Sequence, residues 1–389
     1  MNNNKKTFIK GALLGALIMF LICGIGAYSI IFSGIFGSSV ISNSTIAKLE
    51  LIQAYIDESF LYEIDEEALE DGIYQGYIAA LGDDYAAYYT AEETAELLES
   101  TSGEYTGIGA LLSQNLETGI VTLVTIFEDS PAMEVGLQDG DLLDKVNGED
   151  ITGEDLTNIV TKVKGEEGTT VDITIYREST DEFLTFTVTR RVVENPTVSY
   201  EMLEDQVGYI AVSEFDTITL EQYQEALDDL EAQGMESLVI DLRNNPGGNL
   251  ETVCDMLELI LPEGLIVYTE DKDGNREEYY SSGDNEFTLP LAVLVNGYSA
   301  SASEIFAGAV QDYGIGEIVG TTTYGKGIVQ QLMGLPDDTM IKFTISEYFT
   351  PLGRNIHGIG IVPDIAVEYD YDDLETDEQL EKAIEAVTQ

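Results

Sequence analysis

The second half of the chain alternates buried strands with amphipathic helices, and this rhythm restricts the fold more than any other feature of the sequence. After Asn195 and Pro196, four short apolar runs predict strands, at 207–212, 238–242, 291–295 and 318–320. Apolar residues at helical spacing fill the intervals at about 220–233, 249–261 and 301–313. Buried strands that alternate with helices are typical of an α/β fold. We therefore predict an α/β core over residues 194–389.

The stretch before this core has a different texture. Residues 103–193 contain short β-type apolar runs separated by glycine turns, at 119–126, 141–148, 170–176 and 183–189. One helix is predicted near 154–164, where Leu156, Ile159, Val160 and Val163 share one side. These features predict a small β-rich domain.

Residues 41–102 are predicted to form a helical region. From about residue 45 to residue 100 the pattern is amphipathic, and Leu49, Ile52, Tyr55 and Ile56 lie on one face opposite an acidic one. The piece 81–85, Leu-Gly-Asp-Asp-Tyr, interrupts this pattern and predicts a turn.

A membrane anchor is predicted within residues 1–40. Lys5, Lys6 and Lys10 precede a stretch without charge from 11 to 47, whose most apolar part runs from about 11 to 36. About 20 apolar residues suffice to cross a bilayer, and basic residues before the span favour an inside N-terminus and an exported remainder. A cleaved signal peptide is the alternative. The length of the run and the lack of a clear Ala-x-Ala site favour a retained anchor.

The chain is strongly acidic. It has 17 lysines and arginines against 73 aspartates and glutamates, with a single histidine, for a formal net charge of −56. A hydrophobic fraction of 44% is ordinary for a globular protein, so the acidic groups belong to folded surfaces. Nucleic-acid binding requires clustered cations and is excluded. Zinc sites built from several histidines or cysteines are excluded too, and a histidine-based triad has one candidate only.

Three segments of the core each follow a predicted strand, where active-site residues are commonly placed. The first, 241–248, reads Asp-Leu-Arg-Asn-Asn-Pro-Gly-Gly. Its glycines allow backbone N–H groups to approach a ligand closely, as in an oxyanion hole. The alternative is an ordinary turn between a strand and a helix.

The second segment, 296–304, contains Ser299, Ser301 and Ser303 between alanines at a predicted helix start. A hydroxyl there lies beside free helix N–H groups and the positive end of the helix dipole. The alternative is structural, because Ser301 and Glu304 have the spacing of a capping box.

The third segment, 323–331, holds Lys326 between two glycines, and Gln330 follows four residues later. A neutral lysine can activate a serine if burial lowers its pKa from about 10.4 toward neutrality. The negative field of the chain opposes this, although no acidic residue occurs from 321 to 336. Gln330 returns to the same side as Lys326 in a strand or a helix and could orient the amine. The alternative is a surface lysine on a hairpin.

Together these segments resemble the carboxyl-terminal processing peptidases, also called tail-specific proteases. The resemblance continues through 353–364, 81–85 and 103–109, so it covers nearly everything beyond the predicted membrane run. It implies a crotonase-like or Clp-protease-like α/β core. It also implies that Ser301, which has the family's spacing to the lysine, is the nucleophile, Lys326 the general base and Gln330 the orienting third member.

The same resemblance places the oxyanion donors on Ala302 and on one of two glycines, Gly247 or Gly248, which the sequence does not separate. Tyr298 departs from the family, which often has a small residue before Ser299. This departure concerns access to the site and not its chemistry.

The β-rich domain resembles a PDZ domain, through Gly107 to Ala110 and through the segment 140–148. PDZ domains add an extended peptide to a sheet edge and hold its terminal carboxylate on backbone N–H groups. The resemblance implies a peptide-binding loop made of Thr106, Gly107, Ile108, Gly109 and Ala110. The helix that carries Leu156, Ile159 and Val160 would form the opposite wall. The alternative is a β-domain that only packs against its neighbours.

Three further features are predicted to be structural. Cys254 lies on an apolar helix face, and burial is expected; no second cysteine outside the membrane run is available for a disulfide. Residues 271–275 begin like a calcium loop, but Arg276 replaces its glycine and Ser282 its final glutamate, so a hairpin turn is expected. His357 lies in a glycine-rich stretch with no evident acidic partner.

These observations predict a membrane-anchored serine endopeptidase outside a bacterial cell membrane, which cleaves proteins selected through their C-termini. Its partners would be protein or peptide substrates with exposed C-termini, with no nucleic acid and no metal or organic cofactor. The sequence leaves homo-oligomer formation open. The alternative is a membrane-tethered PDZ adaptor whose peptidase core is inactive.

Overall fold

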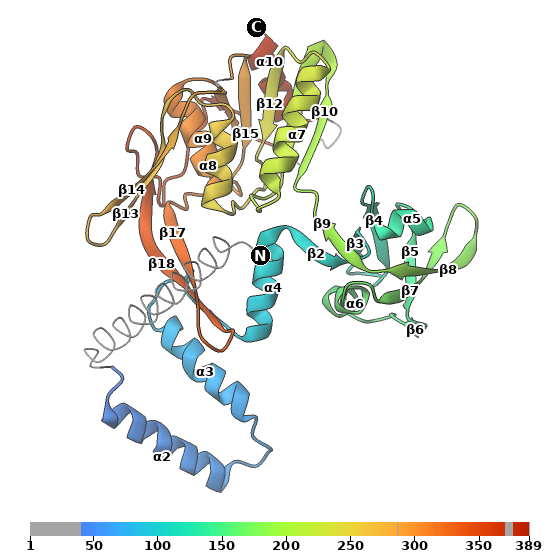
Figure 1. Ribbon diagram of the computed structural model, residues 1–389, viewed down its shortest axis with the longest axis vertical. Helices are drawn as coiled ribbons and strands as arrows, with labels where there is room; N and C mark the ends of the chain where they lie inside the picture. The colour runs from blue at the N-terminus through green and yellow to red at the C-terminus, as the bar shows by residue number, and fades with distance from the viewer. Residues whose placement is uncertain (1–39, 286, 370–375, 389) are drawn as a thin grey trace, which may run out of the picture. The chain divides into compact units, whose positions relative to one another are not determined.

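The computed structural model describes residues 40–285, 287–369 and 376–388 (Figure 1). The predicted membrane run at 11–36 lies outside these residues. Among the helices that are described, none combines the length and the apolar character needed to span a bilayer.

Residues up to Glu70 and residues from Asp71 onward form two separate compact units. The first contains helix α2 (Asn43–Ser59), whose N-cap Ser42 accepts a hydrogen bond from the Thr45 N–H. No residue of α2 is buried, so the apolar face predicted for this helix is present but is not covered by other described residues.

A six-stranded sheet forms the centre of the second unit, in the order β10-β11-β12-β15-β16-β19. Its strands are β10 (Val198–Met202), β11 (Val207–Val212), β12 (Ser237–Asp241), β15 (Leu291–Val295), β16 (Glu317–Gly320) and β19 (Ile365–Ala366). A short 3₁₀ turn, η2 (Glu204–Gln206), joins β10 to β11. The strands from β11 to β19 are parallel, and β10 pairs with β11 in the antiparallel sense. The four strands predicted for the α/β core are confirmed.

Helices cover both faces of this sheet (Figure 1). They are α7 (Thr219–Ala232), α8 (Leu250–Glu258), α9 (Ala302–Tyr313) and α10 (Glu378–Thr388). Alternation along β12 explains the layering, because Leu238 and Ile240 pack into the cluster that includes α7, α8 and α9, whereas Val239 packs with α10. Cys254 of α8 is buried as expected, and burial raises the pKa of its thiol to about 12.

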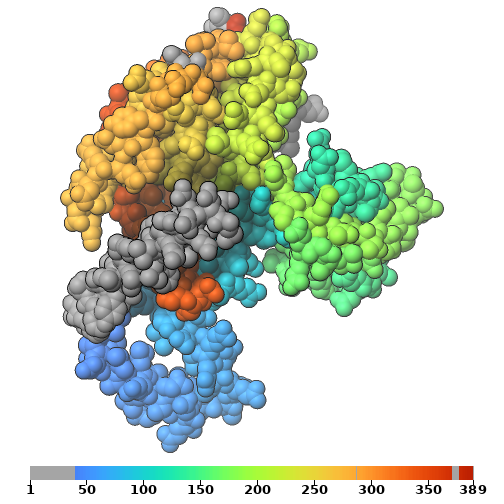
Figure 2. Space-filling view, viewed as in Figure 1, coloured from blue at the N-terminus to red at the C-terminus, as the bar shows by residue number. Residues whose placement is uncertain are grey.

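The structure has a second, five-stranded sheet. Only the hairpin turn at 271–275 within it was predicted from the sequence. The sheet contains β1 (Ala87–Tyr89), β13 (Gly264–Asp271), β14 (Arg276–Ser281), β17 (Ile328–Gly334) and β18 (Met340–Phe349). The calcium-like segment is the β13–β14 turn, in which Asp271 accepts the N–H groups of Asp273 and Asn275. Figure 2 shows this hairpin projecting from the core. Strand β1 lies between helices α3 (Glu66–Ala79) and α4 (Ala91–Ser102), so the expectation that helix resumes directly after the 81–85 turn was wrong at 87–89.

The β-rich domain has the predicted character. Its sheet contains β3 (Ala110–Gln114), β4 (Val121–Ile126), β5 (Leu142–Val146), β6 (Glu149–Asp150), β7 (Thr170–Arg177) and β8 (Glu182–Thr189). Two short helices complete it, α5 (Pro131–Val135) and α6 (Leu156–Val163). The chain enters and leaves through the paired strands β2 (Glu104–Gly107) and β9 (Arg191–Glu194). Helix α6 confirms the helix predicted near 154–164, with slightly shorter bounds.

Candidate active site

The three segments singled out in the sequence meet at one edge of the central sheet. They follow β12, β15 and β16, which are adjacent and parallel, so their carboxyl ends open on the same edge. Hydrogen bonds join the segments directly: the Ala300 N–H donates to the Asn245 carbonyl at 3.1 Å, and the Tyr324 N–H donates to the Ser299 carbonyl at 3.0 Å. The topology thus explains why residues far apart in the sequence form one site.

The three serines of the second segment have different environments. The Ser299 hydroxyl is fully buried and donates to the Leu242 carbonyl at 2.7 Å. The Ser303 hydroxyl is also fully buried and donates to the Asn245 carbonyl at 2.9 Å. Ser301 is only half-buried. Ser299 and Ser303 therefore hold the loop together, and Ser301 is the serine that can meet a substrate.

Ser301 has an unusual backbone. It precedes α9 with φ of 56° and ψ of −113°, a region that residues with a side chain rarely adopt. Its carbonyl accepts the hydroxyl of the buried Tyr348 at 3.1 Å, which helps to hold this conformation. Strain of this kind often occurs at active sites, where the surrounding structure enforces it.

Glu304 is a fully buried carboxylate that joins the serine segment to the lysine segment. It accepts the Ser301 N–H at 2.9 Å, as the predicted capping box requires. It also accepts the Thr323 hydroxyl at 2.6 Å and the N–H groups of Gly325 and Lys326 at 2.7 and 2.8 Å. Four donors compensate for the burial of its charge. The sequence alone predicts only the capping role of Glu304.

Lys326 is half-buried on the loop before β17, in the segment whose backbone N–H groups donate to Glu304. Burial lowers the pKa of Lys326 below its ordinary value, and Lys342 acts in the same direction, whereas Glu304 opposes them. Its amine lies 4.7 Å from the centre of the Tyr85 ring. Lys326 is therefore not a free surface lysine.

Gln330 lies on β17, opposite Thr344 of β18, next to an irregularity in the pairing of these strands. Its amide nitrogen donates to the Thr344 hydroxyl at 3.2 Å. This bond leaves the amide oxygen as the acceptor that a lysine amine requires.

The two glycines of the first segment differ in what they face. A Cβ added to Gly247 would lie 2.8 Å from the Ser301 Cβ and 3.0 Å from the Ala302 nitrogen, so the chain there passes directly beside the serine. The Gly247 N–H already donates to the Asn245 side chain at 2.8 Å. Within the described residues, the N–H groups of Gly248 and Ala302 donate to no protein acceptor.

Comparison with known proteins supports what this geometry suggests. The sequence profile of peptidase family S41 matches residues 206–367, and a PDZ domain profile matches residues 125–177. The chain is 35% identical to the carboxy-terminal processing protease CtpB of Bacillus subtilis (strain 168) over 82% of its own length and 67% of that protein. The chain belongs to the carboxyl-terminal processing peptidases.

One further relative supports this assignment, and one solved structure is similar to the chain. A probable CtpA-like serine protease of Staphylococcus aureus (strain COL) is 30% identical over 94% of this chain and 75% of that protein. A solved structure, the photosystem II D1 C-terminal processing protease, is 28% identical, with a TM-score of 0.49 over 82% of this chain and 86% of the other. The two family profiles and the two relatives, CtpB and the CtpA-like protease, show that the chain is a serine-type C-terminal processing peptidase that carries a PDZ domain.

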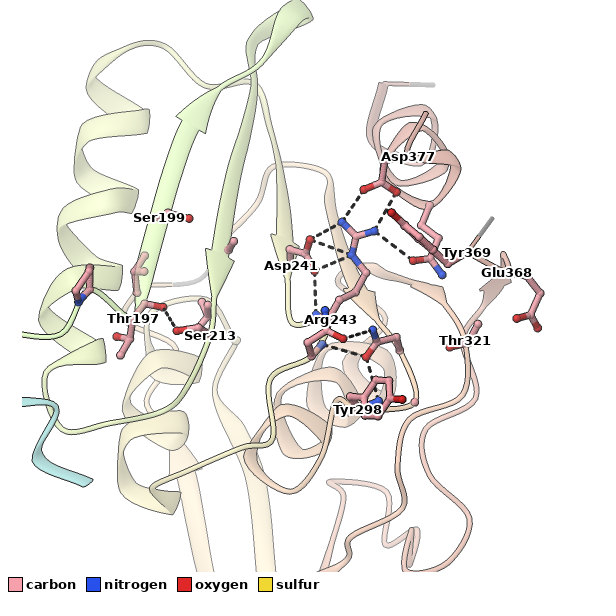
Figure 3. A pocket seen from close by; sticks show the side chains of 18 of the residues that line it. Thr197, Ser199, Ser213, Asp241, Arg243, Tyr298, Thr321, Glu368, Tyr369 and Asp377 are labelled. Carbon is pink, nitrogen blue, oxygen red and sulfur yellow. Dashed lines mark hydrogen bonds and ion pairs between the residues drawn. The ribbon is translucent and has the colours of Figure 1, made fainter. Parts of the chain in front are cut away.

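The peptidase core has two neighbouring cavities at this edge of the sheet. The smaller, of about 520 Å³, is lined by Lys326, Tyr85, Tyr324, Pro246, Ala300, Asn244 and Tyr298. The larger, of about 1120 Å³, also has Asn244 and Tyr298 in its wall and extends past Arg243 (Figure 3). Tyr298, which the sequence analysis related to access, therefore stands between the two cavities.

Arg243 is a structural residue of the larger cavity that sequence reasoning missed. Its guanidinium pairs with Asp241 at 2.6 Å and with Asp377, just before α10, at 2.8 Å (Figure 3). It also donates to Gln379 at 3.2 Å. These bonds tie the C-terminal helix to the loop that carries Gly247 and Gly248.

The predicted peptide-binding loop joins β2 to β3 in the PDZ domain. Thr106 and Gly107 end β2, and Ala110 begins β3. Ile108 and Gly109 between them are buried, and Gly109 has φ of 75° with the Ser130 Cβ only 2.3 Å from where its own Cβ would lie. A larger residue cannot replace this glycine without displacing the loop.

The side chains of helix α6, the predicted wall, differ in how deeply they are buried. Ile159 is fully buried in the core of the PDZ domain, together with Val163. Leu156 and Val160 are half-buried, and Leu156 packs against the edge of the same core. They remain candidates for the wall, and Ile159 does not.

No group of three or more histidines, cysteines, aspartates or glutamates among the described residues is arranged to hold a metal ion. His357 is exposed, and its backbone N–H donates to the side-chain oxygen of Asn355 at 2.8 Å. Its backbone lies against Gly327.

Proposed function

We propose that Ser301 and Lys326 cleave peptide bonds through an acyl-enzyme. Neutral Lys326 takes the proton of the Ser301 hydroxyl, and the oxygen attacks the substrate carbonyl carbon. The lysine then gives that proton to the leaving amine. Water, activated by the same lysine, hydrolyses the ester and restores the serine. Gln330 orients the amine through its free amide oxygen.

One observation carries this proposal. Of the three neighbouring serines, Ser299 and Ser303 are buried and committed to backbone carbonyls, whereas Ser301 is accessible on a strained backbone. Glu304 connects that backbone to Lys326, whose pKa burial lowers. The presence of Ser301, Lys326 and Gln330 together argues against the inactive adaptor.

The oxyanion would be held by the N–H groups of Gly248 and Ala302. Gly247 is a poor donor, because its N–H is already bonded to Asn245. Its role is instead to let the backbone pass close to Ser301, where a Cβ would collide. Fixed donors aimed at the developing negative charge are usually the largest single contribution to such catalysis.

Cleavage of an unfolded reporter protein tests these roles. Ser301→Ala and Lys326→Met should each abolish cleavage, while Ser282→Ala and Lys272→Met, which alter exposed residues of the hairpin region, should retain wild-type rates. Cleavage by Ser301→Ala at the wild-type rate would remove Ser301 from the mechanism.

We also propose that the PDZ domain selects substrates by their C-termini. The support is the glycine-containing loop 106–110 at the start of β3 and the half-buried Leu156 and Val160 on α6. Two reporters that differ only in a free or an amidated C-terminus should differ in KM, with the free carboxylate preferred. Equal KM values would contradict selection through the carboxylate.

The anchor in residues 1–40 remains a proposal based on sequence. Full-length protein expressed in a bacterium should sediment with membranes, and a C-terminal tag should be digested by protease added outside the cytoplasmic membrane. Deletion of residues 1–40 should release the protein from the membrane fraction. Sedimentation that is unchanged by the deletion would contradict the anchor.

A further inference from the structure

The loop 81–85 between α3 and β1 reaches the candidate active site. Its position is fixed by β1, which pairs with β18 so that Ala87 lies opposite Lys342 and Tyr89 opposite Met340. β18 in turn pairs with β17, which carries Gln330. A segment far from the core in sequence is thereby held beside two members of the proposed catalytic group.

Tyr85 contacts the lysine. Its half-buried ring lies 4.7 Å from the Lys326 amine and forms part of the 520 Å³ cavity around that amine. Tyr324 lies in the wall of the same cavity. The face of an aromatic ring attracts a charged ammonium and not a neutral amine.

Asp83 contacts the partner of Gln330. Its carboxylate accepts the Thr344 N–H at 2.9 Å, across 261 residues of sequence. It also accepts the N–H of Tyr85 at 3.0 Å, so the same carboxylate fixes the loop. Thr344 is the residue whose hydroxyl accepts the Gln330 amide at 3.2 Å.

We propose that the loop 81–85 belongs to the active site, with Tyr85 and Asp83 as positioning residues. Tyr85 holds the protonated amine of Lys326 on its ring in the free enzyme, and loss of the proton weakens this hold and frees the amine to act on Ser301. Asp83 fixes Thr344 and through it Gln330. This inference rests on the proposed serine–lysine function.

Besides burial, Lys342 on β18 lowers the pKa of Lys326 and Glu304 on α9 raises it. The other titratable groups around Tyr85 and Lys326 are Tyr324, Tyr298, Asp83, Asp84 and His357. All of them stay in place when Tyr85 alone is replaced. A shift in the titration of Lys326 then measures the effect of the Tyr85 ring.

The test compares Tyr85→Leu with Tyr85→Phe in the full-length chain, with kcat/KM on an unfolded reporter measured across pH. Tyr85→Phe keeps the ring and should keep the midpoint of the rise in activity. Tyr85→Leu removes it and should lower the midpoint by about 0.5 to 1 pH unit, given about 1 kcal/mol for a cation over a ring. An unchanged or raised midpoint in Tyr85→Leu, or an equal shift in both variants, would overturn the role of Tyr85. A merely structural role would reduce rates without moving the midpoint.

A second measurement does not depend on activity. In a Ser301→Ala background with lysines labelled at the ε-carbon, the NMR titration of Lys326, assigned by its loss in Lys326→Arg, should shift in the same direction. Tyr85→Met replaces Tyr85→Leu if the latter does not unfold cooperatively. For Asp83, Asp83→Ala should lower kcat and Asp83→Asn should restore much of it, because the amide oxygen still accepts the Thr344 N–H. Equal losses in both would overturn that part.

The two levels of the proposal fail separately. Wild-type cleavage by Ser301→Ala would refute the proposed function whatever Tyr85 does. An inactive Ser301→Ala, together with an unmoved Lys326 titration in Tyr85→Leu, would refute only the role of Tyr85.

Discussion

The carboxylate of Glu304 accepts the backbone N–H of Lys326 at 2.8 Å, and the same oxygen accepts the N–H of Ser301 at 2.9 Å. One buried side chain thus sets the spacing between the proposed nucleophile and the proposed base. Because the carboxylate is fully buried, this arrangement contributes to both stability and catalysis.

Glu304→Gln should destabilise the fold and move the pH profile. Its amide presents a single acceptor oxygen to four donors, so the free energy of unfolding should fall by about 2 to 4 kcal/mol, as for lost hydrogen bonds to a charged group. Removal of the negative charge also favours neutral Lys326, because Glu304 raises the pKa of that lysine. Urea denaturation and the pH dependence of kcat/KM measure the two effects, and the midpoint should move to lower pH.

Glu317→Gln is the matched control, because Glu317 is exposed at the start of β16. It should leave both quantities unchanged. Wild-type stability in Glu304→Gln would show that the four donors do not depend on the carboxylate.

Part of this site could be predicted from sequence, because each of its segments directly follows a strand that the sequence predicts. The segments around Gly247, Ser301 and Lys326 each follow an apolar run, and parallel strands bring such segments to one edge. The choice of Ser301 over Ser299 and Ser303 rested on the resemblance to the family and its serine–lysine spacing. The structure adds a physical reason, since the other two hydroxyls are buried and bonded to carbonyls.

The remainder depends on contacts across long stretches of sequence. Glu304 looks like a capping residue until its partners at 323–326 are placed beside it. Asp83 and Thr344 are separated by 261 residues and carry no pattern that pairs them. Strands β13, β14, β17 and β18 were missed because their pairing with one another, and not with the central sheet, defines them. Gly247 and Gly248 could not be told apart in the sequence, because they differ only in their neighbours: Gly247 lies beside Ser301 and Gly248 beside Phe215.

Gly247→Ala should impair catalysis more than stability. The new Cβ would lie 2.7 Å from the Ala300 carbonyl oxygen and 2.8 Å from the Ser301 Cβ, at a φ of 109° that side chains rarely adopt. The displaced backbone should misplace the oxyanion donors, and loss of one such donor typically lowers kcat by about 100-fold or more. Steady-state kinetics on the reporter measures this.

Gly297→Ala is the control for this substitution, since the nearest atom to its new Cβ is 3.9 Å away. Its kcat should be close to that of the wild type. A kcat for Gly247→Ala equal to that of Gly297→Ala would argue against close passage of the backbone beside Ser301.

Asp216→Asn should stabilise the protein increasingly as pH rises. Burial, with a smaller effect of Glu214, raises the pKa of Asp216 to about 6, and one of its oxygens is buried without a hydrogen-bond partner. The folded state therefore binds the proton more tightly than the unfolded state, whose pKa is about 3.9, and ionisation costs stability as pH rises between these values. The variant should gain on the order of 2 kcal/mol relative to the wild type between about pH 4 and pH 7.

Denaturant unfolding at several pH values measures this difference, with the exposed Asp228→Asn as control. The control should show a difference from the wild type that is independent of pH. A constant difference for Asp216→Asn as well would mean that Asp216 titrates normally in the folded protein.

Covalent labelling by a fluorophosphonate tests the serine–lysine pair most directly, because the probe reacts only with an activated serine. Mass spectrometry of the labelled full-length chain should place the adduct on Ser301 and not on Ser299 or Ser303. The labelling rate should rise with pH and should be lost in Lys326→Met but kept in Lys272→Met. An adduct on another serine, or undiminished labelling of Ser301 in Lys326→Met, would contradict the account.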